Sequence, residues 1–205
     1  MYEEMLSRQH QPLLIVISGP SGVGKDSVLQ CMKERELPFH FVVTATSRPQ
    51  REGEVHGVDY FFTTRDEFET MIAGGELIEH ALVYDDYKGI PKEQVQQALA
   101  SGHDVIMRID VQGAATIRKL YPEALLIFLS TNSEQELIER LKARRTETAE
   151  SMELRLTSAR KELEKIGLFD YYVINAENHL DQAVDTILNI INTEHHRSNP
   201  RKVIM

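Results

Sequence analysis

The sequence predicts an α/β fold in which a parallel sheet core carries helices on both faces, with a small β-rich insertion and a helical lid added to it. Apolar runs of strand length alternate with segments whose apolar residues recur at helical spacing, which is typical of a parallel sheet covered by helices. A polar stretch, residues 46–59, interrupts the alternation and indicates an insertion. A charge-rich stretch, residues 140–165, indicates a solvated helical hairpin.

The core elements follow in chain order. We predict core strands at residues 13–17, 39–44, 105–110, 125–129 and 171–174. Helices are expected directly after the first strand's glycine-rich loop, at about 92–100, near 114–120 and at 180–191. The last helix is clearest, because these residues keep the i, i+3, i+4, i+7 spacing of a helix packed on a sheet: Leu180, Ala183, Val184, Ile187, Leu188 and Ile191.

The insertion carries its own strand and helix signals. Thr64 and Glu67 predict a capping box ahead of a short helix that the glycine pair 74–75 ends. Its strands are expected at residues 60–62, 77–81 and 82–84. A second capping box, Ser133 with Glu136, predicts the start of the lid's first helix.

The composition limits the classes of partner and location that the protein can have. With 205 residues, 41% of them hydrophobic, the chain can bury a sizeable core as one domain. A formal net charge of −9 argues against nucleic acid or a membrane surface as a partner, because such binders need a basic footprint. No apolar stretch approaches the roughly 20 residues of a membrane span, and residues 1–12 lack a signal-peptide apolar region. The lone Cys31 is expected to be a small buried hydrophobe, and we predict a cytoplasmic protein.

The loop after the first strand is a phosphate-binding P-loop. Its glycines let a triphosphate approach the backbone, whose N–H groups converge with the positive end of the following helix behind them. Lys25 adds a charge for the β- and γ-phosphates. The expected ATP-binding residues are Gly19, Pro20, Ser21, Gly22, Val23, Gly24, Lys25, Asp26 and Ser27.

Asp26 departs from the usual pattern, because Ser or Thr commonly follows the lysine and supplies a hydroxyl to Mg²⁺. Three interpretations stay open. Asp26 could bind the metal directly or through water, Ser27 could be the donor, or Asp26 could only favour the positive start of the helix. Both residues are therefore candidate metal ligands.

A second anion site is predicted in the polar insertion. Arg48 and Arg51 lie three residues apart around a proline and can grip a phosphate from fixed directions. The phenol of Tyr60 can add a donor. The alternative is that these are ordinary surface arginines of a loop, but beside a P-loop, on an insertion of this length, a second phosphate site is favoured.

With these motifs in place, the chain resembles the guanylate kinase family from about residue 13 to 191. The markers are GPSGVGK at 19–25, TSRPQREGE at 46–54, DYFF at 59–62, ELIEHA at 76–81 and IDVQGA at 109–114, with an arginine-bearing lid. The resemblance implies a P-loop NTPase-type core at residues 13–43, 89–133 and 165–194, a GMP-binding insertion at 44–88 and a lid at 134–164. Residues 1–12 would be an extension, and residues 195–205 a flexible tail with little to pack against.

The resemblance further implies transfer of the ATP γ-phosphate to GMP with Mg²⁺, in purine nucleotide metabolism and GMP recycling, by a monomer or homodimer. Thr44, Arg48, Arg51 and Tyr60 resemble the ligands of the GMP phosphate, and Glu79 and Asp110 those of guanine. Lys25 with the arginines of the lid and its hinge would be catalytic, the arginines being Arg140, Arg144 and Arg155.

The residues themselves agree with a guanine site. Guanine presents N1–H and a 2-amino group on one edge, and the carboxylate of Glu79 can accept from both. Adenine would leave that carboxylate unpaired, and such sites can reject an analogue by roughly 10⁴-fold. The alternatives are that Glu79 is a solvated strand residue and that Asp110 is only a strand-end cap.

Two further departures stand out, besides Asp26. The loop at 87–91 has Lys88 and Ile90 where the family usually has tyrosine and serine; Lys88 can replace a phenol as phosphate donor, but Ile90 cannot replace a hydroxyl. Arg108 stands where the family usually has an acidic residue, which makes Asp26 a candidate for compensating metal ligand. The alternatives for the whole chain are a noncatalytic interaction module, which should show an eroded P-loop, and a kinase for a different phosphate acceptor.

Overall fold

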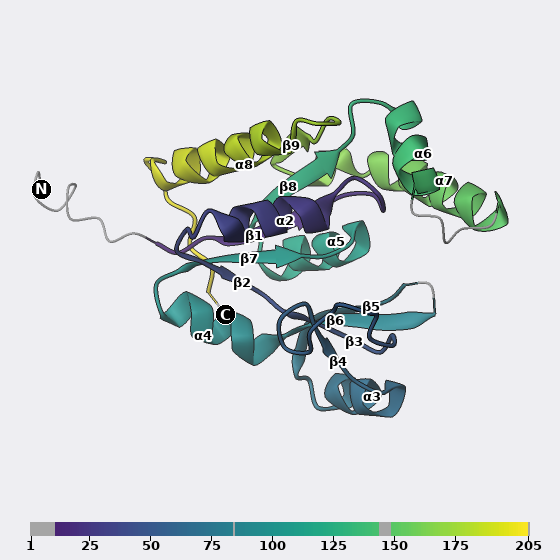
Figure 1. Cartoon of the computed structure of the whole chain (residues 1–205). Helices are drawn as coiled ribbons and strands as arrows, with labels where there is room; N and C mark the ends of the chain where they lie inside the picture. Colours follow the sequence, from purple (N-terminus) through teal and green to yellow (C-terminus); the bar gives the residue numbers. More distant parts are fainter. Residues whose placement is uncertain (1–10, 84, 144–148, 205) are drawn as a thin grey trace, which may run out of the picture.

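The computed structural model describes residues 11–83, 85–143 and 149–204. At its centre is a five-stranded sheet in the order β2-β7-β1-β8-β9, and every neighbouring pair is parallel (Figure 1). The strands are β1 Leu14–Ser18, β2 Phe39–Phe41, β7 Asp104–Arg108, β8 Leu125–Ser130 and β9 Tyr171–Ile174. All of β1 is buried, because strands with helices over both faces are apolar on both sides.

Helices cover both faces of this sheet, as predicted. The first buried cluster joins Ile15 and Ile17 of β1 to α2 (Lys25–Glu34) and α8 (Leu180–His195). The second joins Leu14 and Val16 to α4 (Lys92–Ala100) and α5 (Val111–Leu120). Alternate residues of β1 thus face opposite helix layers, which fixes the strand between them. The loop that follows β1 therefore lies at the carboxyl ends of the parallel strands.

A second sheet of four strands, in the order β4-β3-β6-β5, lies beside the core (Figure 1). Its strands are β3 Thr44–Thr46, β4 Tyr60–Phe62, β5 Leu77–Val83 and β6 Asp86–Pro91. Helix α3, Arg65–Ala73, begins at the predicted capping box: the side chain of Thr64 accepts from the backbone of Glu67, and that of Glu67 from the backbone of Thr64.

Two strand predictions were wrong. The stretch 39–44 is not one strand; β2 belongs to the core sheet and β3 starts the small sheet, so the chain changes sheets between them. The predicted strands 77–81 and 82–84 are one strand, β5, as far as residue 83, because no turn residue separates them; Tyr84 lies outside the described residues, and Asp85 has φ 70°. The small sheet extends to Pro91, three residues past the predicted end of the insertion at residue 88. The division of the chain into a core, an insertion at 44–88 and a lid stays a prediction.

Two helices, α6 Glu134–Ala143 and α7 Ala149–Leu163, form the predicted helical hairpin. Half of the second capping box is present: Ser133 Oγ accepts from the backbone N of Glu136 at 3.1 Å, but the Glu136 carboxylate accepts from the N of Asn132. A 3₁₀ turn, Ile166–Leu168, leads from α7 to β9. Arg144 lies outside the described residues.

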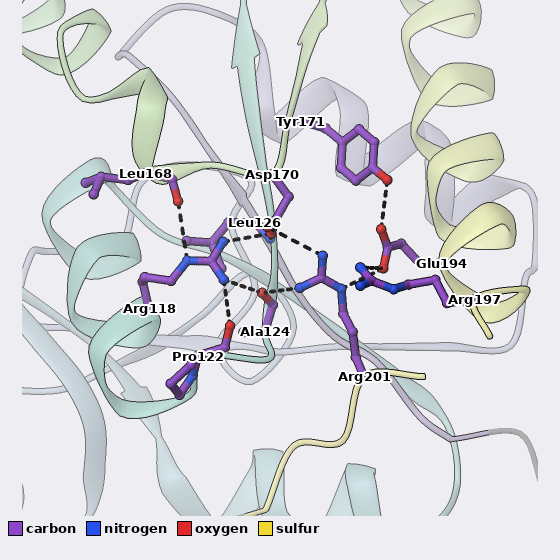
Figure 2. Close-up of polar contacts among 10 residues, drawn as sticks. All are labelled: Arg118, Pro122, Ala124, Leu126, Leu168, Asp170, Tyr171, Glu194, Arg197 and Arg201. Carbon is purple, nitrogen blue, oxygen red and sulfur yellow. Dashed lines mark hydrogen bonds and ion pairs between the residues drawn. The ribbon is translucent and has the colours of Figure 1, made fainter. Parts of the chain in front are cut away.

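The prediction that residues from His195 onward have little to pack against was wrong (Figure 2). Arg201 is buried, with its Nε donating to Glu194 at 2.6 Å and its Nη2 lying 3.4 Å from Asp170. Val203 packs against the second apolar cluster. Helix α8 continues past the apolar pattern and buries Glu194, and a buried carboxylate requires a cation, which the chain beyond the helix supplies.

Two smaller predictions concern burial and membranes. Cys31 is a free thiol, only half-buried against the first cluster. Among the residues that the structure describes, no helix combines the length and the apolar character needed to cross a bilayer.

Candidate active site

A cleft of about 400 Å³ opens between the P-loop, the small sheet, the end of β7 and helix α7. The structure brings most of the predicted site residues to its lining: Gly19, Ser21, Gly22, Gly24, Lys25, Asp26, Thr44, Arg48, Arg51, Tyr60, Glu79, Lys88, Asp110 and Arg155. These residues come from segments far apart in the chain. The two anion sites predicted separately therefore share one cavity.

Two P-loop glycines are required by close approaches as well as by backbone conformation. Gly19 has φ 142°, and a Cβ there would lie 2.1 Å from the carbonyl oxygen of Leu129 in β8. Gly24 has φ 91°, and its Cβ would lie 2.4 Å from Nδ2 of Asn175. A side chain at Gly19 would clash with the backbone of β8, and one at Gly24 would displace the buried Asn175, so the shape of the loop depends on these two glycines.

Lys25 begins α2, and its ammonium is held by the loop itself. The Nζ donates to the carbonyl oxygens of Gly19 at 2.5 Å and Pro20 at 2.9 Å. Burial lowers the pKa of Lys25 to about 8, and the carboxylate of Glu162 on α7 opposes that shift. Burial raises the pKa of Glu162 in turn, with Lys25 opposing. The helical hairpin thus places a carboxylate, as well as an arginine, over the P-loop.

Arg48, predicted for the second anion site, is held in place on the cleft lining. Its guanidinium forms a two-pronged ion pair with Glu54, one prong being Nη1 to Oε2 at 2.7 Å, and its Cζ lies 4.8 Å from the centre of the Tyr60 ring. The hydrogen bonds that Arg48 donates to Glu54 raise the pKa of Arg48. Glu54 also accepts from the backbone N of Arg51 at 2.8 Å. One carboxylate therefore holds both the guanidinium of Arg48 and the backbone at Arg51.

Glu79 and Asp110 meet at the start of α5. Glu79 is 5% exposed, which excludes the solvated-strand alternative. Its carboxyl group lies against Gly113, where a Cβ would come within 2.8 Å of it. Asp110 caps the helix, since its Oδ1 accepts from the N of Gly113 at 2.8 Å. Burial, and then the charge of Asp110, raise the pKa of Glu79 to about 8.

Arg108, at the end of β7, forms an ion pair with Asp26 of the P-loop helix. The side chain of Arg108 is 18% exposed and that of Asp26 69%. On its other side, the Cζ of Arg108 lies 5.0 Å from the centre of the Tyr60 ring. Burial lowers the pKa of Arg108 to about 10, so the group remains a cation at neutral pH. The two departures noted in the sequence are thus direct partners.

Some predicted residues lie elsewhere. Arg140 sits behind the P-loop, donating to the carbonyl oxygens of Val23 at 3.2 Å and Asn175 at 2.8 Å. Ser27 is exposed on α2 and is not among the lining residues of the described chain. Pro20 and Val23 line a separate cavity of about 210 Å³. Ile90 is fully buried in the second apolar cluster, so it presents no group to a base.

Sequence reasoning gave no site role to several lining residues. Arg155, which was predicted, reaches the P-loop, with Nη1 3.5 Å from Ser21 Oγ. Ser158 and Glu162 line the same wall one and two helical turns further along α7, so the helical spacing from Arg155 could have found them. Gln112 lies within the quoted IDVQGA motif, and Glu54 within TSRPQREGE. Arg108 was noticed only as a departure.

Comparison with known proteins agrees with this geometry. The family model described as Guanylate kinase matches residues 11–194. The chain is 49% identical over 201 residues to Guanylate kinase 2, chloroplastic/mitochondrial, of Oryza sativa subsp. japonica, covering 98% of this chain and 70% of that protein. It is 46% identical over 184 residues to Guanylate kinase of Bacillus subtilis (strain 168), covering 89% of each.

A solved structure shows the same fold. The crystal structure of guanylate kinase from Anaplasma phagocytophilum matches with a TM-score of 0.75 at 27% identity, over 93% of this chain and 89% of that one. The P-loop, the pair Arg48 and Arg51, and the buried carboxylate of Glu79 lie within the span that the family model matches. The chain therefore belongs to the guanylate kinase family, whose members phosphorylate GMP with ATP.

Proposed function

We propose that this chain transfers the γ-phosphate of ATP to GMP, giving ADP and GDP, within the cleft between the P-loop and the small sheet. The observation that carries this assignment is that Lys25 and the Arg48–Arg51–Tyr60 cluster line one cavity. Donor and acceptor phosphates bound there would lie in one space, as an in-line transfer requires. The interaction-module alternative is not favoured, because the P-loop lysine and glycines are in place.

The acceptor would be bound at both ends. Its phosphate lies among Arg48, Arg51 and Tyr60, with Lys88 and Thr44 at the same wall. Its base lies at Glu79 and Asp110, where an ionised Glu79 accepts from N1–H and the 2-amino group. Adenine offers neither hydrogen, so the buried carboxylate would be left unpaired, and this favours guanine over other acceptors.

Catalysis would be mainly electrostatic. The transition state of phosphoryl transfer is loose, with charge on the equatorial oxygens, so the protein aligns the reactants and offsets that charge. Lys25 from the P-loop and Arg155 from α7 are the groups placed for this. Arg144 stays a prediction in the same role. Closure of the helical hairpin over the cleft would exclude water, which otherwise would hydrolyse ATP.

Mg²⁺ would accompany ATP and neutralise charge on its β- and γ-phosphates. No three His, Cys, Asp or Glu side chains gather as a metal cluster in the described residues. Mg²⁺ with a nucleotide requires only one or two carboxylates beside phosphate and water oxygens. Asp26 fits this demand, since it lines the cleft and most of its carboxylate is exposed, whereas Ser27 lies outside the lining.

We also propose a cytoplasmic location and a monomer or homodimer; the rice relative's name places that protein in chloroplasts and mitochondria. The function is tested by a coupled assay of ADP formation with GMP, AMP, UMP and CMP in parallel. GMP should be used strongly and the others weakly. Lys25→Ala should abolish turnover with an unchanged melting temperature. ADP formation that is equal for all four acceptors, or normal in Lys25→Ala, would exclude the proposal.

A further inference from the structure

Arg108 occupies a position between the two phosphate sites. It stands at the carboxyl end of β7, and it contacts the P-loop helix on one side, through Asp26, and the small sheet on the other, through the Tyr60 ring. Tyr60 in turn packs against Arg48, whose Cζ is 4.8 Å from the same ring. A nucleotide phosphate moving from the P-loop to Arg48 would therefore pass beside the guanidinium of Arg108.

Stability does not account for this cation. Burying a guanidinium costs free energy, and here the partner carboxylate is 69% exposed, so solvent weakens the pair. An arginine carries five N–H donors in one plane. The pairing with Asp26 engages Nη1 through one carboxylate oxygen, which leaves donors of the same plane for the oxygens of a phosphate that enters the cleft.

We propose that Arg108 is a further catalytic residue of the reaction proposed above: its guanidinium binds the phosphoryl group between donor and acceptor, and Asp26 is a positioning residue that aims it. The planar fork matches two oxygens of the transferring group, and its charge adds to that of Lys25 where negative charge develops. Asp26 limits the rotation of the fork without neutralising it, because most of the carboxylate stays in water.

The test is steady-state kinetics at saturating Mg²⁺ on Arg108→Gln, Arg108→Lys, Asp26→Asn and the double variant Asp26→Asn/Arg108→Gln. Arg108→Gln should lower kcat by about 10²-fold to 10³-fold, with a much smaller change in the KM for GMP. Arg108→Lys should restore only part of the rate, because an ammonium lacks the fork. Asp26→Asn should lower kcat less and add nothing to Arg108→Gln, since it acts through that residue.

Arg65 supplies the matched control. It also pairs with a carboxylate, Glu69, at 3.4 Å and lies over a tyrosine ring, that of Tyr87, at 4.9 Å, but it is not among the residues lining the cleft. Arg65→Gln should keep the parental kcat. Melting temperatures of all variants check the fold, and removal of Arg108 leaves no buried charge behind, because Asp26 is exposed.

Two outcomes would overturn the inference. A kcat in Arg108→Gln within about twofold of the parent denies Arg108 a catalytic role. Independent, multiplying effects of Asp26→Asn and Arg108→Gln deny Asp26 the positioning role. Either result leaves the proposed function intact if the parent protein still phosphorylates GMP, whereas a parent without that activity removes the proposed function itself.

Discussion

The carboxyl group of Glu79 lies directly over Gly113, so close that a Cβ on Gly113 would come within 2.8 Å of it. The contact joins β5 of the small sheet to the first turn of α5 in the core. Because the carboxyl group is the end of the flexible Glu79 side chain, a methyl group added at Gly113 would move that carboxyl group rather than helix α5. The glycine therefore sets the position of the carboxylate that we propose as the acceptor for guanine.

Gly113→Ala should consequently raise the KM for GMP by about 10-fold to 100-fold, because the carboxylate is displaced by roughly an ångström from its productive place. The melting temperature and the KM for ATP should change little. Initial-rate kinetics with each substrate varied in turn measures this. Gly167→Ala is a control for glycine replacement itself, since a Cβ on Gly167 would meet no atom within 4 Å and Gly167 is not among the residues that line the cleft. An unchanged KM for GMP would mean that guanine is read elsewhere.

Binding of GMP should depend on pH through Glu79. Its pKa of about 8 means that the unliganded protein holds the proton at neutral pH, whereas guanine's donors require the ionised form. Affinity for GMP should therefore rise with pH up to about 8 and then level off, and binding at pH 7 should release a proton. Calorimetric titration without ATP, in two buffers of different ionisation enthalpy, measures the release.

Glu79→Gln is the control for the pH effect, because it keeps the shape and cannot titrate. The variant should lose most of the proton release, bind GMP weakly and discriminate less against AMP, since the amide presents a donor to guanine's own donors. Proton release that is the same in the parent and in the variant would rule out Glu79 as its source.

Arg140 and Arg155 were both predicted from the sequence to be catalytic, but their replacement should have different effects on stability and rate. Arg140 holds the P-loop from behind through Val23 and Asn175, so Arg140→Ala should lower the melting temperature and raise the KM for ATP. Arg155 lines the cleft over Ser21, so Arg155→Ala should lower kcat by about 10²-fold with little change in melting temperature. Melting temperatures and steady-state kinetics of both variants test this difference. The same changes in melting temperature, KM for ATP and kcat in both variants would contradict a structural role for Arg140 and a catalytic role for Arg155.

The Mg²⁺ requirement distinguishes the two candidate ligands on the P-loop helix. Asp26→Asn should raise the Mg²⁺ concentration that gives half-maximal rate far more than it raises the KM for GMP, since a metal shell is sensitive to ligand charge. Ser27→Ala should leave the Mg²⁺ dependence unchanged, because Ser27 is exposed outside the cleft lining. The reverse pattern would assign the ion to Ser27.

The end of the chain should contribute measurably to stability. Arg201→Ala leaves the carboxylate of Glu194, 3% exposed, without its buried partner, and should lower the free energy of unfolding by about 3 kcal/mol. Arg197 also pairs with Glu194 but is 44% exposed, so Arg197→Ala should cost well under half as much. Denaturant unfolding followed by circular dichroism compares the two variants. Equal small losses would show that Arg201 is dispensable.

The parts of the molecule that local patterns describe could be predicted from the sequence. The glycine-rich loop between an apolar strand and a helix identified Lys25 as the P-loop lysine. The capping box predicted at Thr64 and Glu67 is present in the structure. The sequence also indicated a helix-covered parallel sheet, since a run such as residues 14–17 of β1 is apolar at every position. These features depend on neighbours within a few residues along the chain.

Features that depend on distant partners could not be predicted. Asp26 and Arg108 each looked like an isolated departure, and only the packing of β7 beside β1 makes them partners. No local pattern marks Glu194 or Arg201 as buried, although the fold buries them together. The change of sheet between β2 and β3 likewise leaves no local signal, because both pieces have strand character.

The Arg201 anchor also determines which way the molecule faces when it is held by its C-terminal end. Arg201 contacts Ala124 and Asp170, which precede β8 and β9 (Figure 2). Val203 lines the same surface cavity as Pro12, which precedes β1. These are the amino ends of the parallel strands, whereas the P-loop follows the carboxyl end of β1. A protein attached to a sensor chip or resin through that terminus would therefore present its cleft to the solution, which suits surface-based binding measurements with nucleotides.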